Sequence, residues 1–305
     1  MPKTFPGLLR RLEEAPTFFK MAGAGNDFIV IDNRSSDIEN ASELAQRLCM
    51  RRLSIGADGL ILVENSARAT FRMRYLNADG SQAFCANGTR CAARFAFLNV
   101  IAPRRMTIET DAGIVGAEVH EQEVTLTLPD PRDARLLHPL NVGETTVRGS
   151  YIRVGVPHYV VFLRDDLWSH DIVPLGRGIR SHAELQPEGA NADFVVVRDR
   201  SSLEVRTYER GVEDETLACG SGVVASVAVA ALFGRIDSPV SVLTRGGIRL
   251  HVSFDRGGAA GAGAITEVRL RGDARVVFKS ELTPETLEGF DPRWVRNPTK
   301  EGPAS

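Results

Sequence analysis

Two of the four cysteines, Cys85 and Cys219, stand where the sequence predicts that a helix begins. Each follows a polar turn and precedes small residues that lead into an apolar segment, residues 88–98 in the first case and 222–233 in the second. The first turn of a helix has free N–H groups and a partial positive charge, which favour a thiolate over a thiol. The same N–H groups can hold a substrate carboxylate. We therefore expect both thiols to have a lowered pKa and to be reactive.

A pair of such sites is suited to proton transfer on the two faces of one carbon atom. If the thiols face each other across a cleft, one thiolate can remove an α-proton while the other thiol protonates the opposite face. Inversion of an amino-acid stereocentre requires this geometry. We interpret Cys49 and Cys91 as small core residues, because most cysteines are buried and inert. A metal site built on Cys85 and Cys91 lacks further ligands nearby in the sequence.

The overall composition is that of a globular protein without a strongly charged partner. The chain has 305 residues, about two domains on a length prior, of which 43% are hydrophobic and 25% charged. Its 37 basic and 39 acidic residues give a net charge of −2, which indicates neither a nucleic acid nor a membrane surface as partner. The most apolar run, residues 223–233, is shorter than the roughly 20 residues of a membrane span. The N-terminus lacks the apolar region of a secretory signal, so we expect the cytoplasm and reduced cysteines.

The remaining pattern predicts many strands and few helices. Helices are expected over residues 42–52, 88–98 and 222–233, and the third is apolar on all sides, which is typical of a buried helix. Short β-branched segments between turns predict strands over residues 28–32, 59–63, 70–75, 105–109, 124–128, 159–163, 194–198, 202–208 and 240–244. This combination predicts an α+β fold in which sheets wrap central helices.

Two landmarks recur along the chain and suggest duplicated halves. The segment around Asp27 resembles that around His158, 131 positions later, and Cys219 follows Cys85 by 134 positions. Chance similarity between two common strand–turn–helix units would give the same pattern, so that alternative stays open. We expect an N-terminal extension over residues 1–16, halves over 17–131 and 132–273, and a loose tail over 295–305, with the boundary in a Pro- and Asp-rich turn.

The residues around the cysteines resemble those of the diaminopimelate epimerases. The resemblance extends from about residue 19 to residue 278 and rests on blocks at residues 21–28, 55–59, 77–81, 85–91, 157–158, 209–211 and 219–222. It implies an α+β fold of two pseudo-symmetric halves, each a mostly antiparallel sheet wrapped around a central helix, with residues 274–294 returning to the N-terminal half. It also implies a homodimer that interconverts LL- and meso-2,6-diaminopimelate, for lysine and peptidoglycan synthesis, without pyridoxal phosphate or metal.

The resemblance also assigns roles to single residues. Cys85 and Cys219 match the two catalytic cysteines, and His158 and Glu209 match residues that assist the thiols. The positions that match substrate contacts are Asn26, Asn77, Ala86, Asn87, Asn191, Glu209, Arg210, Gly220 and Ser221. Arg210 offers a planar fork for a carboxylate. The alternative for the asparagines is a structural role in turns, and the alternative for Glu209 and Arg210 is an exposed charged pair.

Three positions differ from the family pattern. Ala86 stands where glycine is usual, Val156 where asparagine often precedes the Pro-His pair, and Gly59 where some members carry glutamine. The last two remove polar contacts to the substrate and leave two alternatives open. One is another cofactor-independent racemase of the same fold, such as a proline or hydroxyproline racemase, although those carry a Gly-Gly-His type motif after the first cysteine. The other is a non-catalytic relative that only binds an amino acid.

Overall fold

The computed structural model describes residues 16–164, 166–257 and 263–287. The expected tail, and all but the last residue of the expected N-terminal extension, lie outside these residues. The first half of the chain contains β1 (Thr17–Gly23), β2 (Asn26–Asp32), α1 (Ala41–Leu48), β3 (Gly59–Glu64), β4 (Phe71–Asn77), α2 (Ala86–Leu98), β5 (Arg105–Thr110), β6 (Gly113–His120) and β7 (Glu123–Thr127). The second half contains β8 (Arg132–Val142), β9 (Thr145–Val154), β10 (Val156–Phe162), α3 (Val173–Arg180), β11 (Asn191–Asp199), β12 (Ser202–Glu209), β13 (Asp214–Thr216), α4 (Gly220–Leu232), β14 (Val240–Thr244), β15 (Arg249–Gly257) and β16 (Ala264–Asp273). They are followed by β17 (Arg275–Glu281) and α5 (Pro284–Leu287).

The two halves repeat one order of strand pairing. In the first half β2 is parallel to β3, β3 antiparallel to β4, β4 parallel to β5, and β5, β6 and β7 are antiparallel neighbours. In the second half β10, β11, β12, β14, β15 and β16 follow the same order of parallel and antiparallel pairings. This agreement confirms the expected α+β fold of two pseudo-symmetric halves.

The strand register corrects the sequence comparison of the halves by one residue. His158 lies opposite Asn191 in the parallel β10–β11 pair, and Phe28 lies opposite Gly59 in the parallel β2–β3 pair. Phe28 also packs in the core that contains α2, whereas the next residue, Ile29, packs under α1. The residue equivalent to His158 is therefore Phe28 and not Asp27. The difference matters because a shift of one residue turns a strand side chain to the other face of the sheet.

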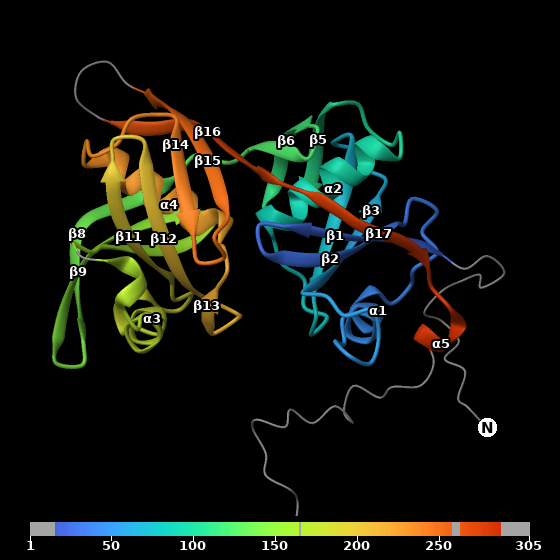
Figure 1. Cartoon of the computed structure of the whole chain (residues 1–305), viewed down its shortest axis with the longest axis horizontal. Coiled ribbons are helices and arrows are strands. Elements are labelled where there is room, and N and C mark those ends of the chain that lie inside the picture. Colours follow the sequence, from blue (N-terminus) through green and yellow to red (C-terminus); the bar gives the residue numbers. More distant parts are fainter. Residues whose placement is uncertain (1–15, 165, 258–262, 288–305) are drawn as a thin grey trace, which may run out of the picture.

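The helices α2 and α4 occupy the centre of their halves, as the apolar patterns predicted. One hydrophobic core surrounds both helices and continues between them, and smaller clusters lie under α1 and α3. Figure 1 shows α2 inside the right-hand half and α4 inside the left-hand half. The strands β9, β10, β11, β12, β15 and β16 all contact α4 and nearly all of its residues are buried, which explains why its sequence has no polar face.

The last two long strands connect the halves. β16 pairs with β7 of the first half, and the chain then crosses to pair β17 with β1. Figure 1 shows this segment in orange and red running from one half to the other. In the described ranges, no helix is long and apolar enough to cross a membrane.

Candidate active site

Both expected cysteines are helix N-caps. Cys85 precedes the first residue of α2 and Cys219 precedes the first residue of α4, each with an extended backbone. The Cys85 Sγ atom accepts a hydrogen bond from the backbone N–H of Gly88 at 3.4 Å, and the Cys219 Sγ atom lies 3.5 Å from Ser221 Oγ. The local sequence favours this arrangement because small residues after each cysteine allow the helix to begin close to neighbouring backbone. Cys49 and Cys91 are buried in the core, as expected.

The expectation of a lowered thiol pKa was wrong. Burial raises the pKa of Cys85 to about 11, against the opposing effect of the Gly88 N–H. Burial, together with the carboxylates of Glu209 and Asp193, raises the pKa of Cys219 well above its usual value. Loss of water around the sulfur atoms outweighs the helix N–H donors. Both groups are therefore thiols at neutral pH, and a neighbouring group must take a proton before either can act as a base.

The N-termini of α2 and α4 meet between the two halves. The side-chain amide of Asn87, in α2, donates to the backbone carbonyl of Ala218 at 3.3 Å. A Cβ atom on Gly220 would lie only 3.1 Å from the Cβ atom of Ala86. Ala86 is not among the residues with a positive φ, so its methyl group is accommodated where the family usually has glycine. The free backbone N–H groups at the N-termini of α2 and α4 consequently lie close to one another.

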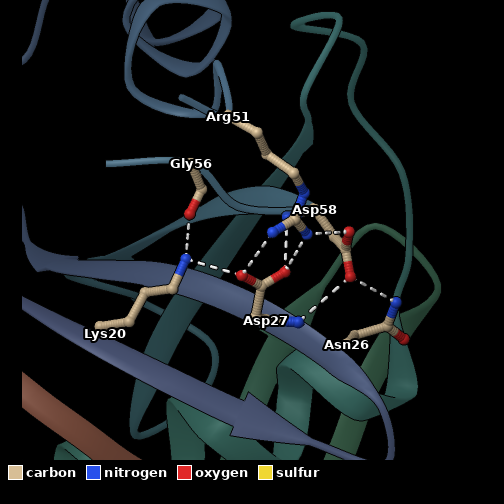
Figure 2. A network of polar contacts seen from close by, with 6 residues as sticks. All are labelled: Lys20, Asn26, Asp27, Arg51, Gly56 and Asp58. Carbon is tan, nitrogen blue, oxygen red and sulfur yellow. Dashed lines mark hydrogen bonds and ion pairs between the residues drawn. The ribbon is translucent and has the colours of Figure 1, made fainter. Parts of the chain in front are cut away.

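Asn26 is held in a polar network on the side of the first half. The residues drawn in Figure 2 are Lys20, Asn26, Asp27, Arg51, Gly56 and Asp58. Asn26 donates through Nδ2 to Asp58 at 2.9 Å and accepts through Oδ1 from Asn87 at 2.8 Å. Arg51 in turn forms an ion pair with Asp58 at 2.8 Å. Both ends of the Asn26 amide are therefore oriented, and Asn26 links this network to the helix N-terminus of α2.

A second polar cluster lies in the other half and is completely buried. His158 and Asp193 each have 0% exposure, and their Nδ1 and Oδ2 atoms are 2.8 Å apart. The other carboxylate oxygen of Asp193 accepts a hydrogen bond from Thr207 at 2.7 Å. Asn191 places its Nδ2 atom 3.5 Å from His158 Nε2 and accepts through Oδ1 from the backbone N–H of Arg210 at 2.7 Å.

Glu209 connects the two thiols electrostatically. Its carboxylate, at the end of β12, accepts a hydrogen bond from Thr216 at 2.8 Å, and burial raises its pKa. The charge of Glu209 raises the pKa of Cys219 and also that of Cys85. One carboxylate therefore lies close enough to influence both sulfur atoms, although the cysteines come from different halves.

Asn77 and Arg210 lie at the ends of equivalent parts of the two halves. The side chain of Asn77 donates to Ser81 Oγ at 3.0 Å, within its own turn, so the structure connects it less directly to the other residues. Arg210 donates to the backbone carbonyl of Glu188 at 3.2 Å. Within the described part of the chain, no Asp or Glu side chain forms an ion pair with Arg210. Its charge can therefore serve a carboxylate of a ligand.

Tyr75, which the sequence did not indicate as a site residue, packs its ring directly against Gly59. A Cβ atom on Gly59 would lie 2.3 Å from the Tyr75 ring, so no longer side chain fits there beside this tyrosine. Burial, followed by the nearby Cys85, raises the pKa of the Tyr75 hydroxyl. Tyr75 thus lies near the Cys85 thiol and beside Gly59, the position at which some family members carry a glutamine. Nothing in the local sequence distinguishes it from an ordinary strand tyrosine.

Asp193 and Thr207 were also missed, although Asp193 left a signal. It interrupts the apolar run 192–197, and an aspartate within a buried strand is rare unless it has a partner. Among the described residues, no three His, Cys, Asp or Glu side chains come together in a way that could hold a metal ion.

Known proteins resemble this chain in sequence over most of its length. The family model of diaminopimelate epimerase matches residues 18–130 and 150–267. The chain is 39% identical over 287 residues to the diaminopimelate epimerase of Aquifex aeolicus, with 89% of this chain and 99% of that protein covered. It is 40% identical to that of Chlorobaculum tepidum, with 86% and 100% covered.

Solved structures show the same fold at low sequence identity. A phenazine biosynthesis protein of the PhzF family from Bacillus anthracis has a TM-score of 0.68 at 15% identity, with 88% of this chain and 99% of that chain covered. A hydroxyproline epimerase from Agrobacterium vitis has a TM-score of 0.67 at 15% identity, with 89% and 93% covered. These solved structures are only 15% identical to the chain, whereas the diaminopimelate epimerases are 39% and 40% identical to it over most of its length. The chain therefore belongs to the diaminopimelate epimerase family.

Proposed function

We propose that this protein interconverts LL- and meso-2,6-diaminopimelate, with Cys85 and Cys219 as the acid and base. The observation that carries the proposal is the contact between the N-termini of α2 and α4, the two helices that Cys85 and Cys219 cap, with one carboxylate, Glu209, acting on the pKa of both thiols. The relatives at about 40% identity carry this activity in their names. The product would serve lysine and peptidoglycan precursor synthesis.

The proposed reaction moves protons between the thiols and one α-carbon. Cys219 first gives its thiol proton to a neighbouring acceptor, and the candidate is Glu209, whose charge acts on this thiol. The thiolate then takes the α-proton, and the electron pair of the broken C–H bond stays on the substrate. Cys85 donates its thiol proton to the opposite face, so a new C–H bond forms and Cys85 becomes the thiolate. In the reverse direction the two cysteines exchange roles.

The helix N-termini stabilise the negative charge that develops on the substrate. Backbone N–H groups at the start of α2 and α4 are the donors for the reacting α-carboxylate, and they belong to Ala86, Asn87, Gly220 and Ser221. The other end of the substrate would be bound by Asn26, Asn77, Asn191, Glu209 and Arg210, with Arg210 on the distal carboxylate. This chemistry uses neither pyridoxal phosphate nor a metal ion.

The cellular compartment that we propose follows from the need for reduced thiols. Two active cysteines must stay reduced, and the described structure contains all four cysteines as free thiols, so we propose the cytoplasm as the compartment. We also propose a homodimer, as in the family, which sedimentation would test, and residues 17–131 and 132–273 as the limits of the halves.

The decisive experiment follows deuterium from solvent into the substrate. Reduced protein is incubated with LL-diaminopimelate in heavy water, with a chelator and without pyridoxal phosphate. Formation of the meso isomer together with α-deuterium is expected. The matched controls are Cys85→Ser and Cys219→Ser, each of which should lose epimerisation by about 10²-fold or more, because loss of a positioned acid or base has that effect.

Other results would decide for the alternatives. Inversion of proline or hydroxyproline, without turnover of diaminopimelate, would identify a different racemase of the same fold. Binding of diaminopimelate without α-proton exchange would identify a non-catalytic relative. Full activity of the Cys85→Ser variant would contradict the two-thiol mechanism.

A further inference from the structure

A completely buried arginine lies in α2, one helical turn after Asn87. Arg90 has 0% exposure, and it donates through Nη2 to Asn87 Oδ1 at 2.7 Å and through Nε to the backbone carbonyl of Asp273 at 3.2 Å. Its remaining nitrogen, Nη1, is buried without a hydrogen-bond partner among the described residues. Burying a guanidinium with an unused donor costs free energy, so core stability alone does not explain this arginine.

The corresponding residue of the other half is apolar. The helices α2 and α4 both have 13 residues and begin at Ala86 and Gly220, 134 positions apart. Arg90 therefore corresponds to Val224, which is buried in the core at 1% exposure. The second half thus packs its central helix with valine at this position. The fold of a half does not require a charge there.

The guanidinium of Arg90 determines how the side-chain amide of Asn87 is turned. A guanidinium can only donate hydrogen bonds, so the Asn87 atom that faces it is the oxygen. The nitrogen of Asn87 then donates to Asn26 Oδ1 at 2.8 Å and to the backbone carbonyl of Ala218 at 3.3 Å. Because Ala218 directly precedes Cys219, this amide connects the start of α2 with the residue before the second thiol.

The same chain of hydrogen bonds continues into the network of Figure 2. Asn26 accepts from Asn87 through its oxygen and donates through its nitrogen to Asp58, whose carboxylate accepts. The chain therefore has a group that only donates, Arg90, at its buried end and an acceptor, Asp58, at its other end. Both ends require the same orientation of the two amides.

The chain that crosses between the halves fixes the place of Arg90. Gly272 and Asp273 are the last residues of β16, and a Cβ atom on Gly272 would lie only 3.1 Å from Arg90 Nε. The side chain of Asp273 accepts a hydrogen bond from the backbone N–H of Ala24 at 2.9 Å. The guanidinium consequently lies between the crossing chain and the amide of Asn87, with contacts to both.

We propose that Arg90 is a positioning residue that fixes the side-chain amide of Asn87. Through this amide it orients Asn26 and keeps the start of α2 against Ala218. This inference rests on the proposed function, and Arg90 itself does not touch the substrate. Its effect is to hold the helix N–H donors and the two thiols in one arrangement before the substrate binds.

The test uses Arg90→Met, which keeps a long side chain and removes its charge and its donors. Because small displacements of site groups are costly, kcat/KM for LL-diaminopimelate should fall by about 10²-fold. The matched control is Arg94→Met, one turn further along α2. Arg94 donates to the backbone carbonyls of Glu121 at 2.7 Å and Ala274 at 2.8 Å, so it holds the same crossing chain without touching Asn87.

The control separates the two contacts of Arg90. Arg94→Met should keep most of the activity, even if its thermal stability falls. Equal losses of kcat/KM in Arg90→Met and Arg94→Met would overturn the proposal, because the crossing chain would then account for the effect.

A double-mutant cycle tests whether Arg90 acts through Asn87. Asn87→Ala removes the amide and keeps the backbone N–H that is proposed to bind the substrate. In the Asn87→Ala background, Arg90→Met should cause little further loss of kcat/KM. Independent, additive losses would overturn the proposal, as would an Arg90→Met variant with reduced thermal stability but normal kcat/KM.

Hydrogen exchange of the Asn87 side-chain amide, followed by NMR, gives a readout that needs no substrate. Both hydrogens donate in the folded protein, so they should exchange at least about 10-fold more slowly than those of the exposed Asn141. Arg90→Met should remove this protection, and Arg94→Met should keep it.

The exchange measurement on the parent protein stands even if the variants fail to fold. An Asn87 amide that exchanges as fast as that of Asn141 would overturn the inference, even if the protein epimerises diaminopimelate. A protected amide in a parent protein without turnover would support the arrangement around Arg90 and contradict the proposed function alone.

Discussion

At the scale of single residues, the two thiols are alike in position and unequal in surroundings. Both are N-caps, yet the carboxylates of Glu209 and Asp193 act on Cys219, whereas Cys85 lies near Tyr75 and receives a hydrogen bond from Gly88. Desolvation raises the pKa of both thiols. The helix N-terminus therefore does not supply a ready thiolate here. Its N–H groups are better used to hold a carboxylate, and deprotonation of a thiol is left to its neighbours.

The pH dependence of thiol alkylation tests this interpretation. Glu209→Gln removes a negative charge that raises the pKa of both thiols, so both alkylation midpoints should move to lower pH. The shift should be larger at Cys219, because Glu209 is the largest influence on its pKa after burial. Mass spectrometry of alkylated peptides gives each cysteine separately.

The control for this measurement is Glu188→Gln. Glu188 is exposed and pairs with Arg153, so its removal should leave both alkylation midpoints unchanged. Equal midpoints in Glu209→Gln and the parent would show that Glu209 does not act on the thiols.

Residue types alone predicted part of the candidate site. The sequence correctly predicted that Cys85 and Cys219 stand at the starts of helices, because helix capping depends on residues close together in the sequence. The partnership of His158 with Asp193 joins positions 35 residues apart on neighbouring strands, so it depends on sheet pairing. No local pattern contains that information.

At the scale of elements, the structure adds the helix α3. It has eight residues and begins 132 positions after α1, which is its counterpart in the first half. Its sequence does not reveal it, because two glycines lower the helix propensity of this short segment. A Cβ atom on Gly176 would lie 2.5 Å from Tyr208, and one on Gly178 would lie 2.3 Å from Val142. These glycines let the helix pack closely against strands, a requirement visible only in the fold.

The packing of β3 against β4 also requires a glycine. Gly59→Ala would place a Cβ atom 2.3 Å from the Tyr75 ring and 2.6 Å from the carbonyl oxygen of Leu76. Since a backbone atom cannot move aside easily, we expect a loss of about 1–3 kcal/mol in the free energy of unfolding. Urea denaturation would measure it.

A matched control for this substitution is Gly263→Ala. A Cβ atom there would meet no atom of the described residues within 4 Å, and the stability of this variant should stay within about 0.5 kcal/mol of the parent. A Gly59→Ala variant as stable as the parent would show that Tyr75 and its strand can shift without cost.

At the scale of the whole molecule, the halves depend on each other. Without the second half, β1 would lose its partner β17 and β7 would lose its partner β16. The contact between α2 and α4 would be lost as well. A fragment of residues 17–131 would therefore present unpaired strand edges and part of an open core, which favours aggregation.

We expect this fragment to fail to fold alone, whereas the full chain should unfold in one cooperative transition. Dispersion of amide signals in an NMR spectrum distinguishes the two states. Co-expression of residues 132–287 should restore a folded complex, because it supplies β16 and β17. A folded, monomeric fragment would show that the first half is independent of the crossing strands.

The sequence by itself determined the features that depend on near neighbours. It identified the buried helices, the N-capping cysteines and the family, because apolar periodicity, helix starts and motif blocks are all local, and it suggested the duplicated halves. The sequence comparison matched His158 with Asp27 because residue types alone do not determine which face of a strand a side chain occupies.

The tertiary structure decided the electrostatics and the partners. The pKa of each thiol depends on how much water the entire surrounding fold excludes, which reversed the expected direction. The contact of the buried Asp193 with His158 became visible only when β10 and β11 were paired. Burial and register are sums over distant parts of the chain, and for that reason only the folded molecule could show them.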